Sequence, residues 1–418
     1  RRKEMKKRFL AIAVATAMTA TLFAGCGAKK EDTAAADKKA EAAATEAVAE
    51  AVVEEAVEEA IVEEAVEEAI VAEASVDYDI NKLGLTIATN DFGQGEYSLD
   101  INAWIVESVA NAVGSKVDVV DNQFTVDNIV TQLRSQLAKS PSGVCMIGIA
   151  ETVYPAIAKA CDEANVPYSF FATPPLDEDV AAMSEDPLYA GVVLFEPEEE
   201  AAYLAEQAFE AGCTKAVLLA GAEGDYNHDH RIIGFTAKFE ELGGEVLGVA
   251  RCANPGEGDD KGSNLLSANK DADCAIGMGA GYITSLEGIR DKMGLNYKIY
   301  GCDTTPNLIQ DVVDKKVEII SCGANTGAAY AAILLINKIL GHPIVDEDGN
   351  APYTKALTLY YCDQENAAQF QKFWDEAQRA PLTADEIKAL IGPNVTYDDF
   401  IEALENHADD AYAKIAKY

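Results

Sequence analysis

The strongest constraint on the fold is a repeated alternation of short apolar segments with helix-length amphipathic segments. The first round contains "KLGLTIAT", "KVDVVD", "GVCMIGI" and "PYSFF", and amphipathic stretches such as "TVDNIVTQLRSQLA" separate them. After an acidic turn, a second round begins at "AGVVLF" and continues through "KAVLLAG", "EVLGVA", "CAIGM", "KIYGCD" and "VEIISC". Strands that alternate with helices predict parallel sheets covered by helices on both faces.

Two rounds of similar size predict two similar α/β lobes, each a doubly wound parallel sheet. A chain of 418 residues is long enough to give each lobe its own core. In open parallel sheets, ligands bind beyond the carboxyl ends of the strands. We therefore expect a ligand-binding cleft where these ends of the two lobes face each other.

The first residues resemble a bacterial lipoprotein signal. Lys6, Lys7 and Arg8 precede a short apolar run, and "LFAG" stands directly before Cys26. A basic segment, an apolar segment and small residues before a cleavage point are typical of a secretory signal. The resemblance of "LFAGC" to a lipobox implies cleavage before Cys26 and a lipid on its sulfur. The alternative is an ordinary signal peptide followed by an unrelated cysteine.

The segment that follows is an acidic stretch rich in Ala, Glu and Val. Its core repeats "IVEEAVEEA" about every nine residues, which places successive Val/Ile pairs on opposite faces of a helix. Without a continuous apolar stripe, neither a coiled coil nor a docking face is predicted. We interpret it as a solvated stalk; a helix that binds a partner is the alternative.

The charge and the cysteines exclude several classes of function. The formal net charge is -38 and no basic patch occurs, so nucleic-acid binding is not expected. The eight cysteines from Cys145 to Cys362 form no CxxC pair and none lies near a histidine. We expect them to be buried thiols that act as small apolar side chains, and we expect no metal site and no cofactor.

Four segments, in this order and spacing, resemble the ribose/galactose-like branch of the type I periplasmic-binding-protein family. They are "VVDNQFTVDNIVTQL", "EANVPYSFF", "RIIGFTAKFEELGGEV" and "IYGCDTTPNLIQDVVDKK". The resemblance covers about residues 82–362. It implies a solute receptor whose two lobes are joined by crossing hinge segments, which would fall near residues 191–195, 319–323 and 355–361.

The resulting domain organisation has five parts. They are a lipoprotein signal peptide at residues 1–25, a stalk at 26–76, lobe 1 at 77–190 plus 323–350, lobe 2 at 191–322 plus 351–362, and a helical C-terminal extension at 363–418. Within the extension, Thr383 and Thr396 precede acidic first turns and are expected to start helices.

The resemblance also implies two ligand-binding residues, Arg231 in "HDHR" and Asp303 in "YGCDTT". Arg231 is expected to line an open, wet cleft, although a surface ion pair is the alternative. Asp303 has an alternative role as a helix cap. Further residues are candidates for ligand binding because they follow predicted strands: Asp91, Phe92, Asn122, Gln123, Glu151, Thr173 and Tyr282.

Three departures from the family pattern put a simple pentose or hexose in doubt. Ala172 and Thr173 stand where the family has Asp-Arg, "GAGYITS" lacks its Asn-Asp, and Ser321 replaces its Gln. A sugar or sugar-like compound remains the first expectation, and a nucleoside or an amino acid is the alternative.

The stretch "GDYNHDHRIIGF" places His228 and His230 on either side of Asp229. We expect it to be a loop between a strand and a helix, with exposed histidines and a cap from Asp225, Asn227 or Asp229. A shared zinc ion is the alternative, but zinc needs three or four ligands. No nucleophile paired with a base is evident, so catalysis is not expected.

Taken together, the sequence predicts an extracytoplasmic solute-binding lipoprotein of an ABC importer. It would act as a monomer, bind a small polar ligand, and be anchored to the cell membrane by an N-terminal lipid. The permease would be its protein partner. A receptor that reports its ligand to a membrane signalling protein is the alternative, and a secreted enzyme is disfavoured.

We predict that Cys26→Ser abolishes lipidation and releases the protein from membranes, because the thioether requires the thiol. Fractionation of cells after a high-salt wash measures this. A serine variant that still sediments with membranes would contradict the lipobox interpretation, because an acidic stalk offers no electrostatic attachment to an anionic membrane surface.

Overall fold

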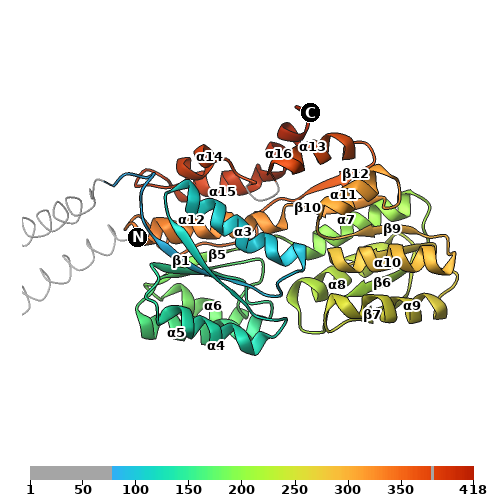
Figure 1. The fold of residues 1–418 in the computed structure, drawn as a ribbon, viewed down its shortest axis with the longest axis horizontal. Helices are drawn as coiled ribbons and strands as arrows, with labels where there is room; N and C mark the ends of the chain where they lie inside the picture. The colour runs from blue at the N-terminus through green and yellow to red at the C-terminus, as the bar shows by residue number, and fades with distance from the viewer. Residues whose placement is uncertain (1–77, 378–380) are drawn as a thin grey trace, which may run out of the picture. The chain divides into compact units, whose positions relative to one another are not determined.

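The computed structural model describes residues 78–377 and 381–418. The expected signal peptide, Cys26 and the acidic segment up to residue 76 lie outside the described residues. The described part contains two six-stranded sheets, each enclosed by helices (Figure 1). The predicted fold class, two parallel-sheet α/β lobes with a helical C-terminal extension, is confirmed.

The first sheet has the strand order β11-β5-β4-β3-β1-β2, and all its pairs are parallel. Its strands are β1 (Thr86–Asp91), β2 (Lys116–Asp121), β3 (Gly143–Met146), β4 (Tyr168–Phe171), β5 (Tyr189–Val193) and β11 (Tyr353–Thr354). Its helices are α3 (Tyr97–Ala112), α4 (Val126–Leu137), α5 (Tyr154–Ala164), α6 (Asp177–Ser184) and α12 (Gly327–Ile339).

The second sheet has the order β12-β10-β9-β8-β6-β7, and only β12 runs antiparallel to its neighbour. Its strands are β6 (Lys215–Ala220), β7 (Glu245–Arg251), β8 (Cys274–Gly277), β9 (Lys298–Gly301), β10 (Ile319–Cys322) and β12 (Tyr360–Asp363). Its helices are α7 (Pro197–Glu210), α8 (Tyr226–Glu241), α9 (Gly258–Ala268), α10 (Ala280–Met293) and α11 (Pro306–Val313).

Both faces of the central strands are buried, which explains why these strands are continuously apolar. The edge strands β2 and β7 are only partly buried and keep charged residues. In β6, Val217 and Leu219 pack with α9 and α10, whereas Leu218 packs on the opposite face with α7 and α8. The first sheet is arranged in the same way, with α3 and α12 on one face and α4 and α5 on the other. The two layers of helices hold the strand ends in place.

The chain crosses between the sheets three times. The crossings are residues 194–196 between β5 and α7, residues 323–326 between β10 and α12, and residues 355–359 between β11 and β12. Gly323 has φ +99° in the second crossing, a conformation that residues with a Cβ rarely adopt. The short helix η3 (Ala324–Thr326) follows it, and Asn325 donates to the Ser98 carbonyl of α3 at 2.9 Å.

The C-terminal extension comprises α13 (Ala367–Ala377), α14 (Ala384–Ala389), α15 (Tyr397–Glu405) and α16 (His407–Ile415). Thr383 and Thr396 form capping boxes at α14 and α15, which confirms the predicted helix starts. The extension contacts both lobes. Asn337 of α12 donates to the Leu390 carbonyl at 2.8 Å, and Gln371 of α13 donates to Gln310 of α11 at 2.7 Å.

The α7–α8 pair in the second lobe depends on a glycine. A Cβ on Gly234 of α8 would lie 2.1 Å from the Glu198 carbonyl oxygen of α7. Because this neighbour is backbone, it cannot rotate away. Gly288 of α10 provides a matched comparison, since a Cβ there would meet no atom within 4 Å.

We predict that Gly234→Ala lowers the free energy of unfolding by about 3 kcal/mol, the upper part of the range for overpacking. Gly288→Ala should raise it by roughly 0.5–1 kcal/mol, because alanine favours a helix more than glycine does. Urea unfolding followed by circular dichroism measures both. Equal effects of the two substitutions would contradict the close approach of α7 and α8.

Candidate functional site

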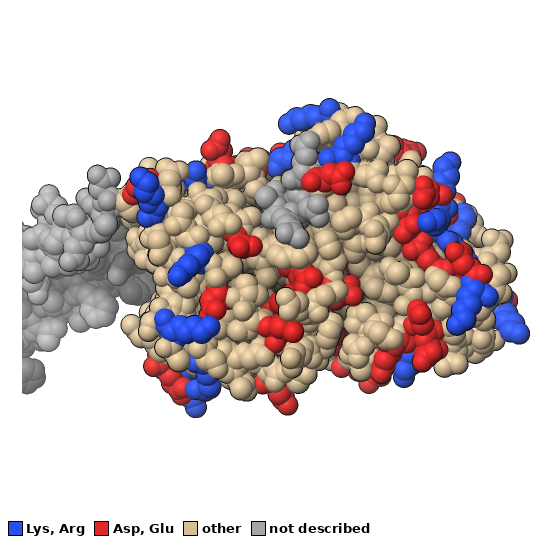
Figure 2. Space-filling view, in the orientation of Figure 1, with Lys and Arg blue, Asp and Glu red and all other residues tan. Residues whose placement is uncertain are grey.

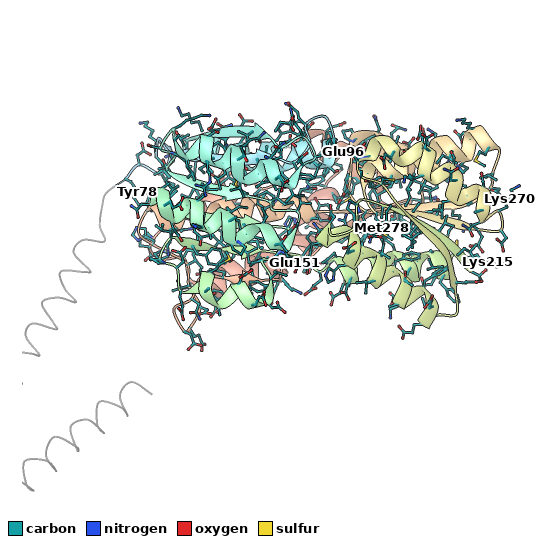
Figure 3. The ribbon with its side chains drawn as sticks, turned by 90° about the horizontal axis from the view of Figure 1, so that it is seen from below. Tyr78, Glu96, Glu151, Lys215, Lys270 and Met278 are labelled. Carbon is teal, nitrogen blue, oxygen red and sulfur yellow. The ribbon has the colours of Figure 1, made fainter. Side chains whose placement is uncertain are left out.

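A cavity of about 540 Å³ opens between the carboxyl ends of the strands of the two lobes. In the first lobe it is lined by residues that follow β1, β2 and β3, among them Phe92, Phe124 and Glu151. In the second lobe the lining follows β6, β7, β8 and β9 and includes Tyr282 and Asp303. Figure 3 shows Glu96 and Glu151 on the side of the first lobe that faces the second lobe. The cavity therefore occupies the predicted cleft.

Aromatic rings line the cavity from both lobes. Phe92 and Phe124 meet edge to face, with ring centroids 6.1 Å apart. Phe124 lies so close to Gly93 that a Cβ there would be 2.3 Å from its ring. From the second lobe, Tyr282 meets the ring of His228 at 5.6 Å. These rings offer apolar faces between which a ligand ring can lie.

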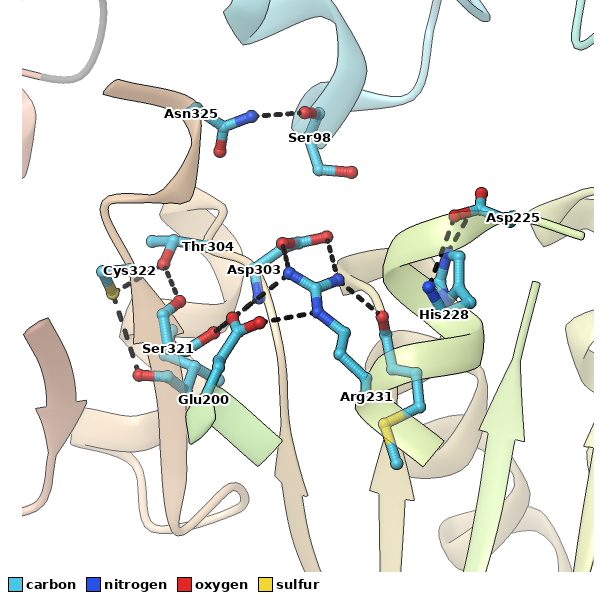
Figure 4. A network of polar contacts seen from close by, with 12 residues as sticks. Ser98, Glu200, Asp225, His228, Arg231, Asp303, Thr304, Ser321, Cys322 and Asn325 are labelled. Carbon is cyan, nitrogen blue, oxygen red and sulfur yellow. Dashed lines mark hydrogen bonds and ion pairs between the residues drawn. The ribbon is translucent and has the colours of Figure 1, made fainter. Parts of the chain in front are cut away.

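Arg231 lies at the bottom of the cleft in a buried ion network (Figure 4). Its Nε donates to Glu200 Oε2 at 2.7 Å and its Nη2 to Glu200 Oε1 at 3.1 Å. Nη2 also donates to Asp303 Oδ1 at 2.9 Å, and Nη1 donates to the Met278 carbonyl at 2.9 Å. Ser321 donates to Glu200 as well. Every nitrogen of the guanidinium group is therefore used within the protein.

The expectation that Arg231 lies in an open, wet cleft is wrong. The residue is only 3% exposed, and its partner Glu200 is 2% exposed. Burial raises the pKa of Glu200, and Arg231 opposes this rise. Burial also disfavours the charged form of Arg231, but attraction by Asp303 and Glu200 outweighs this and raises its pKa. Arg231 lines a smaller cavity of about 70 Å³ that shares Asp303 and His228 with the main one. It also holds Asp303 in place, and its expected contact with a ligand remains a prediction.

Four of the residues singled out from the sequence line the main cavity: Phe92, Glu151, Tyr282 and Asp303. Asp303 has the most direct access among the charged residues of the network, because its side chain is 16% exposed. It adopts φ +71°, and its backbone N–H donates to Ser321 Oγ at 3.2 Å. These contacts turn the carboxylate of Asp303 toward both the arginine and the cleft.

Besides Arg231, the candidates that do not line the main cavity are Asp91, Asn122, Gln123 and Thr173. Asp91 is buried and accepts from the Gly93 N–H at 3.1 Å. Asn122 accepts from Asn90 at 2.7 Å and donates to Gln132 at 2.6 Å, so both ends of its amide are used. Gln123 is exposed, and Thr173 is fully buried. Asp91 and Asn122 instead stabilise the loops that carry Phe92 and Phe124.

The expectation that "NHDH" is a loop is also wrong, and of its two histidines only His230 keeps substantial exposure, 32% of its side chain against 15% for His228. Helix α8 already begins at Tyr226, because Asp225 caps it and accepts from the His228 N–H at 3.3 Å. Residues two apart on a helix face opposite sides. His228 therefore lines the cleft, whereas His230 points away and pairs with Glu198 at 2.6 Å. A metal ion shared by the two histidines does not fit this arrangement.

His228 is a cleft residue that sequence analysis missed. Burial lowers its pKa to about 3, and the nearby Arg231 adds to this effect. The ring is therefore neutral near pH 7, and its Nδ1 has no hydrogen-bond partner among the described residues. The sequence did contain a signal for this placement. Asp225 can cap a helix, and a cap at this position starts the helix early and places His228 and Arg231 on one face. Glu96, Phe124 and Glu223 were also missed.

The cysteines of the described part are free and buried, as predicted. Within residues 78–377 and 381–418, one group brings three possible metal ligands within 4.8 Å of one another: Cys213, Asp273 and Cys274. This group lies near the start of β6 and β8, and Figure 3 places Lys215, the first residue of β6, at the far end of the second lobe. Asp273 there accepts from the backbone N–H groups of Thr214 and Lys215. The expectation of no metal site remains a prediction.

A family model described as a periplasmic binding protein domain matches residues 103–343, more than half of the chain. The chain belongs to the periplasmic binding protein family. This family consists of substrate-binding proteins, so the chain is a binding protein and not an enzyme. Within the described residues, no helix of this family member has the length and apolar character needed to cross a membrane.

Solved structures of sugar-binding proteins share the fold. The arabinose transporter component from Shewanella sp. ANA-3, bound to L-arabinofuranose, has a TM-score of 0.61 at 16% identity, covering 73% of this chain and 97% of that protein. A periplasmic sugar-binding protein from Pseudomonas fluorescens gives 0.64 at 12% identity, covering 76% and 99%. A carbohydrate transporter from Acidothermus cellulolyticus 11B, with myo-inositol, gives 0.57 at 14% identity, covering 71% and 99%. No curated protein sequence gives a significant match.

We predict that Arg231→Ala lowers the free energy of unfolding by about 3–5 kcal/mol, because Glu200 is left as a buried, unpaired charge. The double variant Arg231→Met with Glu200→Gln should recover part of this loss. Arg134→Ala is the control, since its pair with Glu163 is about half exposed at both ends, and it should change stability little. Urea unfolding measures all three, and equal losses for Arg231→Ala and Arg134→Ala would contradict the buried network.

Proposed function

We propose that this protein is the solute-binding component of an ABC importer and captures a small sugar-like ligand in the cleft. The observation that carries the proposal is the cavity of about 540 Å³ at the carboxyl ends of two facing parallel sheets. Its volume suits a ligand of monosaccharide size or larger. Family membership, and the L-arabinofuranose and myo-inositol named for two structural neighbours, support the same ligand class.

The lining supplies two complementary kinds of contact for such a ligand. The rings of Phe92, Phe124 and Tyr282 can pack against the apolar faces of a sugar or polyol. The carboxylates of Glu151 and Asp303 can accept hydrogen bonds from hydroxyl groups. Because these groups come from both lobes, a bound ligand would favour the form in which the lobes approach each other.

Closure would be a hinge rotation through the three crossings. The crossings are short, and the glycine at Gly323 tolerates backbone conformations that other residues avoid. Arg231 and its partners belong to the second lobe alone, so the buried network would move as a unit with that lobe. The ligand would then be released when the lobes separate at the permease.

The lipid anchor and the partners are part of the same proposal. Cys26 would carry the lipid, and residues 27–76 would hold the binding domain away from the membrane surface. The permease of the importer would recognise the closed form, and the protein would act as a monomer. The lipobox sequence "LFAGC" and the acidic repeats support the anchor and the stalk.

We predict that Tyr282→Ala weakens ligand binding about tenfold, a loss of roughly 1.4 kcal/mol, because one apolar wall of the cleft disappears. The ligand is first found by a thermal-shift screen of sugars, polyols, nucleosides, amino acids and amines. Ile233→Ala, an exposed change on the same lobe, is the control and should leave affinity unchanged. Calorimetry with the ligand found measures both variants, and the absence of any stabilising solute would contradict the proposed function.

A further inference from the structure

The cleft is lined by acidic groups without an opposing basic side chain. Five carboxylates contribute to the main cavity: Glu96, Glu151, Glu223, Asp225 and Asp303. Among the described residues that line it, none is a lysine or an arginine. In the space-filling view, acidic side chains lie along the boundary between the lobes (Figure 2). A cavity with this composition has a negative potential, which low-dielectric walls strengthen.

The cations nearest to the cleft are already neutralised. Arg231 is shared by two carboxylates, those of Glu200 and Asp303. Arg251 pairs with Asp229 and donates to the Gly221 carbonyl at 3.1 Å. Lys355 pairs with Glu196 at 3.4 Å, outside the cavity lining. Of the five carboxylates that face the cleft, Asp303 is the one paired with Arg231, and none of these three cations is left to balance the other four.

Two of the carboxylates approach each other from opposite lobes. Glu96 precedes α3 of the first lobe and lies against the second lobe: a Cβ on Gly281 would be 3.1 Å from its Oε2. Asp303 lies beside the same turn, since a Cβ on Gly279 would be 3.6 Å from its Oδ2. Burial raises the pKa of Glu96, and repulsion by Asp303 adds to the rise. A positive group between them would remove this repulsion.

The aromatic lining favours the same kind of ligand. Phe92, Phe124 and Tyr282 present rings in the cavity that carries the carboxylates, and ring faces attract cations. A bare divalent metal ion fits less well, because among the described residues no three possible ligand atoms of the cleft lie within 4.8 Å of one another. The carboxylates are spread around a space large enough for an organic molecule.

We propose that the ligand of the cleft carries a positive charge, as an amine-bearing sugar or polyol whose ammonium group lies between Glu96 and Asp303. This inference rests on the proposed function and narrows its ligand class. The ammonium group would donate to carboxylates of both lobes and so link them in the closed form. Anionic sugars would be rejected, because the same carboxylates repel them.

The test compares three sugars that differ in charge: D-glucosamine, N-acetyl-D-glucosamine and D-glucuronate, with the corresponding galacto series alongside. Calorimetry and thermal shift are run at slightly acid to neutral pH, with the sugars at millimolar concentration. The cationic sugar is expected to bind at least tenfold more tightly than its neutral N-acetyl form, as for one charge-assisted contact, and the anionic sugar least. The preference should shrink as salt is added.

Glu96→Gln keeps the shape of the side chain and removes its charge. It should weaken glucosamine or galactosamine binding by about tenfold and leave binding of the N-acetyl sugars unchanged. Glu240→Gln is the matched control, because Glu240 is an exposed carboxylate on α8 that does not line the cleft, and it should change neither.

The outcomes separate this inference from the proposed function. The inference of a positively charged ligand would be overturned if neutral sugars bound as tightly as the amino sugars. It would also be overturned if Glu96→Gln weakened the binding of both equally. Either result would leave the proposed sugar receptor in place. The same conclusion would follow if neutral sugars raised the melting temperature of the protein and amino sugars did not. If no sugar, amine or other solute of the broader screen binds at all, both proposals fail.

Discussion

The buried ion network around Arg231 determines how the second lobe presents its side of the cleft. One guanidinium group joins α8 to Glu200 in α7, to the Met278 carbonyl after β8, and to Asp303 after β9. Ser321 of β10 contacts both Glu200 and Asp303. Five separate segments are thereby joined, and two of them, at Met278 and Asp303, lie just beyond the ends of their strands. The network costs desolvation energy, but it orients Asp303 toward the ligand space.

The fold could be predicted from the sequence because its central strands are buried on both faces and stand out as apolar runs, although the edge strand β2 is only partly buried. The segment "KVDVVD" coincides with β2, and "KAVLLAG" differs from β6 by one residue. Strand ends were harder to predict. β3 was expected to continue to Ile149 but ends at Met146, because the Asn90 side chain binds both the N–H and the carbonyl group of Ile147. A side chain from a neighbouring strand replaces the ladder there, and no local pattern encodes this.

The position of the candidate site could be predicted from the sequence, but the side chains that line it could not. The rule that ligands bind beyond the carboxyl ends of strands identified the loops that carry Phe92, Glu151, Tyr282 and Asp303. It could not distinguish side chains that face the cleft from side chains that hold the loop. Asn122 bonds inward while Phe124, two residues later, reaches the ligand space. The burial of Arg231 depends on Glu200, which is 31 residues away in the chain.

The C-terminal extension constrains how the lobes can move. Its helix α13 packs on α11 of the second lobe, whereas α14 packs on α3 and the α15 residue Ala403 accepts from Tyr330 of the first lobe. Thr358, in the third crossing, donates to the Leu404 carbonyl at 3.2 Å. A rotation of one lobe on the other would displace α13 relative to α14, or one of these helices relative to the lobe on which it packs. In the proposed hinge motion, the extension would therefore add stiffness, and part of the free energy of ligand binding would be needed to rearrange its internal packing.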